Sequence, residues 1–67
     1  MNDFSLLIDR AKEIVENHNP TDTKSCSDLY SLWTEVVKTK DKEVVKEIHK
    51  IITQDRLLNA LRVLGKI

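Results

Sequence analysis

The chain has 67 residues, so it contains one domain at most. With one glycine, one proline and three aromatic residues, its composition argues against a β-sandwich or β-barrel, which needs many turn residues. The net charge is zero, but residues 1–37 hold seven acids against three bases, a net of −4, whereas residues 38–67 hold four acids against eight bases, a net of +4. We expect the two halves to fold against each other; the alternative is a basic surface that binds an acidic partner.

The single cysteine, Cys26, excludes an intramolecular disulfide and favours a reducing compartment. No apolar run approaches the roughly 18 residues of a membrane span, so we expect a cytoplasmic protein without a membrane segment. Cys26, His18 and His49 lack the paired spacing of a zinc site, and one glycine cannot make a glycine-rich phosphate loop. The sequence therefore predicts no enzyme, metal, cofactor or small-molecule substrate, and it predicts that Cys26 lies in the core.

Apolar residues recur at helical spacing between residues 4 and 15, which predicts an amphipathic helix over residues 3–17. Asn2 or Asp3 is expected to cap its start. Pro20 lacks the amide that a helix interior needs, so residues 18–23 are expected to form a loop. The stripe consists of Phe4, Leu7, Ile8, Ala11, Ile14 and Val15.

A second stripe predicts a helix over residues 26–38, antiparallel to the first because the connecting loop is short. Ser25 and Asp28 resemble a capping box at its start. We expect Tyr30 and Trp33 to anchor the core; the alternative is that Trp33 is an interface hot spot. The stripe consists of Cys26, Leu29, Tyr30, Trp33, Val36 and Val37.

The apolar phase is lost at Lys40 and Asp41 and resumes at Val44, which predicts a turn at residues 39–41 and a helix over residues 42–53. Thr39 or Asp41 is the expected cap of this third helix. Because capping residues and the loss of phase coincide here, a second loss of phase further along the chain is best interpreted as another turn.

Between Val44 and Leu64 the apolar stripe changes sides, although no glycine or proline interrupts the segment. On a helical wheel, the centres of its two halves lie roughly 160° apart. Either the helix breaks near residues 53–55 or one straight rod presents two faces. Thr53 as a cap favours a break and a fourth helix over residues 55–64, which Gly65 is expected to close with a positive φ. The halves are Val44, Val45, Ile48, Ile51 and Ile52, then Leu57, Leu58, Leu61 and Leu64.

The predicted fold class is all-α: one helical domain over residues 1–67, built as a small up-down bundle of three to four short amphipathic helices. The last four leucines either complete the core or dock elsewhere. We expect a non-enzymatic protein–protein interaction or regulatory module that presents an apolar helix face to a protein partner or to a second copy. The predicted contacts are Leu57, Leu58, Leu61 and Leu64, with Arg56 and Arg62 as flanking charges.

The alternative is a helical DNA- or RNA-binding regulator that uses the basic C-terminal half. Against it, glutamates alternate with the lysines, and no aromatic residue lies among them to stack on bases. A third option is an inhibitor that presents acids of the first helix to a basic target. The nucleic-acid contacts would be Lys42, Lys46, Lys50, Arg56 and Arg62, and the acids Asp9, Glu13 and Glu16.

Overall fold

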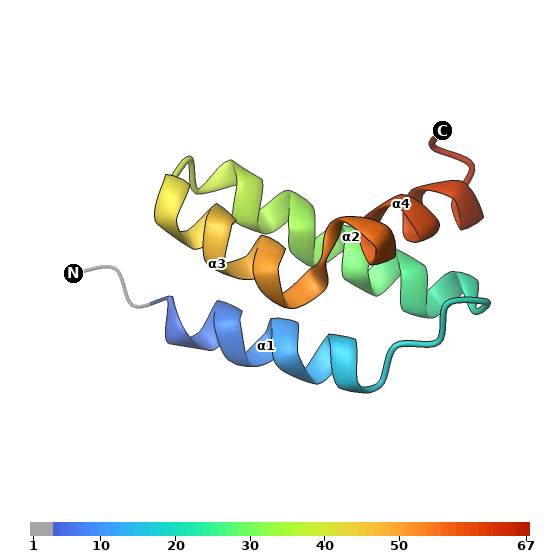
Figure 1. Cartoon of the computed structure of the whole chain (residues 1–67), viewed down its shortest axis with the longest axis horizontal. Coiled ribbons are helices and arrows are strands. Elements are labelled where there is room, and N and C mark those ends of the chain that lie inside the picture. Colours follow the sequence, from blue (N-terminus) through green and yellow to red (C-terminus); the bar gives the residue numbers. More distant parts are fainter. Residues whose placement is uncertain (1–3) are drawn as a thin grey trace.

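The computed structural model describes residues 4–67 and shows a small all-α bundle, as the sequence predicts (Figure 1). Helices α1, α2 and α3 run in alternating directions, whereas α4 continues in the direction of α3. The third pass of the bundle is thus divided between two helices. Helices α2 and α3 each pack against the other three helices, whereas α1 and α4 do not pack against each other. The helices are α1 (Ser5–Glu16), α2 (Thr23–Lys38), α3 (Lys42–Ile52) and α4 (Gln54–Val63).

The start of α2 differs from the prediction. Asp22 is its cap, since the Asp22 carboxylate accepts a hydrogen bond from the Lys24 amide at 3.2 Å. The helix therefore begins three residues earlier than expected, and the predicted capping box of Ser25 and Asp28 is wrong. The Ser25 hydroxyl instead donates to the Asp22 carboxylate at 3.5 Å. The caps proposed for the first helix, Asn2 and Asp3, lie outside the described residues.

Two other predicted helix ends are confirmed. The Asp41 carboxylate accepts from the amides of Glu43 and Val44 at 3.0 and 3.3 Å, which caps α3. At the end of α4, Gly65 has a φ of 71°, and the Lys66 amide donates to the Leu61 carbonyl at 2.8 Å. This is a Schellman closure, in which a residue with positive φ lets the chain reverse and satisfy the last carbonyls.

The junction of α3 and α4 is the single residue Thr53, so the helix is broken and the straight two-faced rod is excluded. Thr53 has φ 70° and ψ 151°, and its side chain makes no capping hydrogen bond. Its amide donates to the His49 carbonyl at 2.8 Å, while its carbonyl accepts from the Leu57 amide at 3.2 Å. One residue therefore ends α3 and starts α4 with a reorientation of the axis.

The core draws on all four helices. Cys26 is fully buried, as predicted, and α4 contributes Leu57 and Ala60. The last helix therefore completes the core rather than standing apart from it. Two positions of α2 depart from the predicted stripe: Leu32 is fully buried, and Val37 is 47% exposed. The buried residues are Ala11, Cys26, Leu29, Leu32, Val36, Val44, Ile48, Ile52, Leu57 and Ala60.

Candidate functional site

The four leucines predicted as contacts have unequal surroundings. Leu57 is only 7% exposed and belongs to the core, so it is not available to a partner in this fold. Leu61 and Leu64 are half-buried against the core, whereas Leu58 is 36% exposed. The flanking Arg56 and Arg62 are both exposed. Leu58 is thus the leucine of this set that presents the most apolar surface.

The three lysines of α3 follow one another at four-residue spacing along one side of the helix. All three are exposed, but the Lys50 ammonium pairs with Glu47 at 3.7 Å. Glu47 and Glu43 line a groove of about 220 Å³ with Phe4 and Ile8, on the α1 side of the helix. Lys42 and Lys46 lie next to the row formed by Val45 and His49, and Lys46 is also three residues from Glu43.

Exposed and half-buried apolar side chains lie where α2, α3 and α4 meet. On α2, positions 30, 33 and 37 are spaced by three and four residues, and so lie along one face. The same spacing places positions 45 and 49 along one face of α3, and positions 54, 58 and 61 along one face of α4. We call this surface the Trp33 face; it consists of Tyr30, Trp33, Val37, Val45, Leu58 and Leu61.

Three side-chain contacts join the rows of the Trp33 face. The rings of Trp33 and His49 lie 5.7 Å apart between centroids and are tilted by 55°. The His49 Nε2 atom lies 2.9 Å from Gln54 Oε1, which links α3 to the first turn of α4. Beyond α4, the Lys66 ammonium lies 5.5 Å from the centre of the Tyr30 ring, within range of a cation–π interaction. The predicted core role of Trp33 holds in part, since its ring is half-buried against the core.

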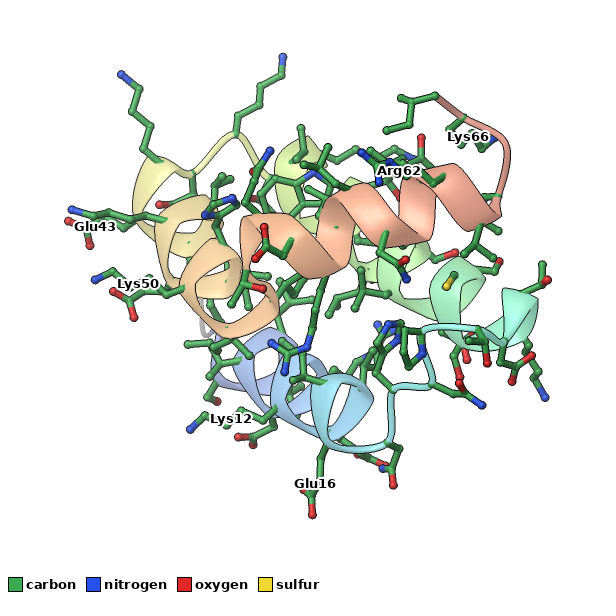
Figure 2. The ribbon with its side chains drawn as sticks, turned by 45° about the vertical axis from the view of Figure 1, so that its right-hand side comes forward. Lys12, Glu16, Glu43, Lys50, Arg62 and Lys66 are labelled. Atoms are coloured by element: carbon green, nitrogen blue, oxygen red, sulfur yellow. The ribbon has the colours of Figure 1, made fainter. Side chains whose placement is uncertain are left out.

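The opposite side of α2 is covered by α1. Glu35 lies about 200° from Trp33 on the helical wheel, and its carboxylate accepts from the Arg10 guanidinium at 3.0 Å. Glu13 and Asp28 line an open groove of about 430 Å³ between these two helices. The side chains in Figure 2 follow this division, with Lys12 and Glu16 of α1 far from Arg62 and Lys66. Among residues 4–67, neither ion pair joins the acidic half of the chain to the basic half.

His18 occupies a separate pocket of about 320 Å³ between the first loop and α4. Both ring nitrogens are buried and have no hydrogen-bond partner within residues 4–67. Burial, and then the nearby Arg56 guanidinium, lower the pKa of His18. Beside it, the Asn59 amide donates to the Pro20 carbonyl at 2.9 Å and holds the loop against α4. This pocket was not foreseen, because a histidine after a helix end gives no sequence sign of burial.

Cys26 and the acidic side chains show no arrangement for metal chemistry in the described part of the chain. No group of three or more histidine, cysteine, aspartate or glutamate residues among residues 4–67 lies together as metal ligands do. Burial, with Asp22 as a smaller influence, raises the pKa of the Cys26 thiol, which opposes formation of a nucleophilic thiolate. None of the helices that the structure describes is long and apolar enough to span a bilayer.

Comparisons with protein families, curated proteins and solved structures find no match to this chain.

The Trp33 face includes residues that the sequence did not assign to a site. Val37 belonged to the predicted core stripe, but it lies in the last two turns of α2 and is exposed. Val45 and Tyr30 were likewise assigned to the core and are half-buried. Periodicity marks these positions as apolar, yet it does not say how far a neighbouring helix covers them.

Proposed function

We propose that this chain is a small non-enzymatic protein-interaction or regulatory module that binds its partner through the Trp33 face. The observation that carries the proposal is the exposure of Val37 and Leu58 beside a half-buried tryptophan. Single exposed apolar residues are ordinary on protein surfaces, but a contiguous apolar face with an aromatic centre is typical of interaction sites. Tryptophan is enriched among residues that dominate binding energy.

The architecture supports the same proposal. Ile52 at the end of α3 is buried in the core, as are Leu57 and Ala60 of α4, and these contacts hold both helices in place. Leu58 lies on the outer side of α4. The face is therefore set on helices that the core already orders, so little conformational entropy is lost when a partner binds. A partner helix in contact with Val37, Trp33 and Leu58 would follow the helix-in-groove mode of recognition. The buried unpaired Cys26 supports a cytoplasmic location as part of the proposal.

The test compares capture by matched baits. The native chain and the variants Leu58→Asp and Lys12→Glu are each immobilised and exposed to a cell extract. Each retained protein is identified, purified and mixed with the purified chain to test for a complex. Leu58 is exposed, so its replacement by aspartate leaves the core intact, and Lys12 projects from α1 away from the face. We expect a stoichiometric complex with the native and Lys12→Glu chains that Leu58→Asp abolishes. A complex unaffected by Leu58→Asp would contradict the proposal.

Self-association is a second form of the same function, and molar mass in solution tests it. The full chain and Leu58→Asp are compared by light scattering over a range of concentrations. A dimer that Leu58→Asp dissociates would assign the Trp33 face to a second copy. Removal of residues 54–67 is not a suitable test, because it would delete the core residues Leu57 and Ala60.

Nucleic-acid binding is the alternative function, and one observation favours it. Lys42 and Lys46 share the side of the molecule that carries two aromatic residues, so cations and rings are closer together than the sequence suggests. However, Lys66 lies over the Tyr30 ring and His49 packs on Trp33, and both side chains would compete with a stacked base. Binding to a DNA duplex at low salt that fades steeply as salt rises would support this alternative.

A further inference from the structure

The charged residues around the Trp33 face are mostly basic, although Asp55 lies three residues before Leu58 on α4. Lys42 and Lys46 border it on α3, Arg62 borders it on α4, and Lys66 borders it on the segment after α4. Figure 2 shows Arg62 and Lys66 together at the C-terminal end of α4. We call these four exposed residues the basic rim. Neither Lys42 nor Lys46 pairs with an acid among the residues that the structure describes.

The glutamates of the same helices lie away from the face. Glu43 and Glu47 face the groove with Phe4 and Ile8, and Glu47 pairs with Lys50. Glu35 pairs with Arg10 on the far side of α2, and Asp55 lines the His18 pocket. The rows that form the face contain no carboxylate among the described residues, although Asp55 and Glu43 lie three residues from Leu58 and Lys46 respectively. The four cations of the basic rim outnumber these carboxylates, so the apolar face is bordered by a net positive charge.

The positive charge around the face indicates which kind of partner it can bind. Two copies docked by the same face would bring two basic rims together, and like charges across an interface are unfavourable. A helix with an apolar stripe flanked by aspartate or glutamate would place leucine-like side chains on Val37 and Leu58 and its acids within reach of the rim. We propose that the Trp33 face binds an acidic amphipathic helix of a partner protein, an inference that rests on the function proposed above.

The probe is a synthetic 18-residue peptide with leucine on one helical face and alanine and glutamate on the others, matched by a peptide with lysine at every glutamate position. Binding to the full chain is followed by the fluorescence of Trp33, the only tryptophan. The glutamate peptide is expected to bind and shift the Trp33 emission to shorter wavelength, and the lysine peptide is not. Raised salt is expected to weaken binding, because the rim is exposed.

Variants separate the rim from the apolar contact. Lys46→Glu and Arg62→Glu are each expected to weaken binding about 3-fold or more, while Lys12→Glu, the same charge change on α1, leaves it unchanged. Leu58→Asp is expected to weaken it at least about 10-fold. Circular dichroism of each variant confirms that the fold is retained.

Several outcomes would overturn the inference. Equal binding of the two peptides, both lost in Leu58→Asp, would leave the proposed function standing and remove the preference for an acidic partner. No binding of either peptide would also overturn it. Tighter binding to a DNA duplex or to phosphatidylglycerol vesicles than to the glutamate peptide would assign the basic rim to a different class of partner.

Discussion

The rings of Trp33 and His49 lie 5.7 Å apart, and this contact fixes the centre of the Trp33 face. His49 also bonds to Gln54 across the break between α3 and α4, with 2.9 Å between Nε2 and Oε1. A single imidazole thus links three helices. The angle at which α4 leaves α3 is set by this side chain as well as by the backbone of Thr53.

His49→Ala removes both the ring contact and the hydrogen bond, so we expect the free energy of unfolding to fall by about 1–2 kcal/mol. Gln54→Ala removes only the hydrogen bond and should cost less. Urea denaturation of both variants and of the double variant measures the coupling between the two residues. Strict additivity would show that the hydrogen bond does not contribute to stability.

Thr53 holds a backbone conformation that β-branched residues rarely adopt, with φ 70° and ψ 151°. Thr53→Gly is expected to stabilise the protein by about 1 kcal/mol, because glycine adopts this conformation without steric strain. Urea denaturation provides the measurement. Thr34→Gly, within α2, is the control and should lower stability by about 0.5 kcal/mol, because glycine forms helix less readily than threonine. A loss of stability in Thr53→Gly would show that the threonine side chain contributes more than its strain costs.

The sequence predicts the helices well and their junction only in part. Capping residues and the shift in apolar phase locate the break at Thr53, but neither indicates its positive φ. Leu32 was missed because α2 packs against neighbours on two sides, so its buried arc is wider than one stripe. The Trp33 face and the His18 pocket depend on how far one helix covers another. That extent is set by the packing of the whole chain rather than by local periodicity.

His18 gives the protein a specific dependence on pH. Burial and Arg56 lower its pKa below the usual 6.5, so the folded state binds a proton less readily than the unfolded state. Its contribution to stability is therefore complete above about pH 6.5 and is lost as pH falls through the folded-state pKa. Asp55 and Arg56 of α4 also line the pocket.

His18→Phe should abolish this part of the pH dependence and raise stability at neutral pH by about 1 kcal/mol, because two buried nitrogens without partners are removed. The measurement is the free energy of unfolding at several pH values between 5 and 8. His49→Gln serves as the control, since it removes the chain's other histidine and should retain the dependence. An unchanged pH profile in His18→Phe would contradict the assignment.

Leu57 and Leu58 are adjacent and chemically identical, yet the structure assigns them opposite roles. For a domain of 67 residues, the total free energy of unfolding is only about 3–10 kcal/mol. Leu57→Ala opens a cavity in the core and should cost about 2–3 kcal/mol, a large part of that total. Leu58→Ala should change the free energy of unfolding by about 0.5 kcal/mol or less, because much of its side chain is already in water. Urea denaturation of the two variants provides the comparison. Similar losses would mean that α4 is rotated about its axis relative to this structure, and the Trp33 face would then lose its most exposed leucine.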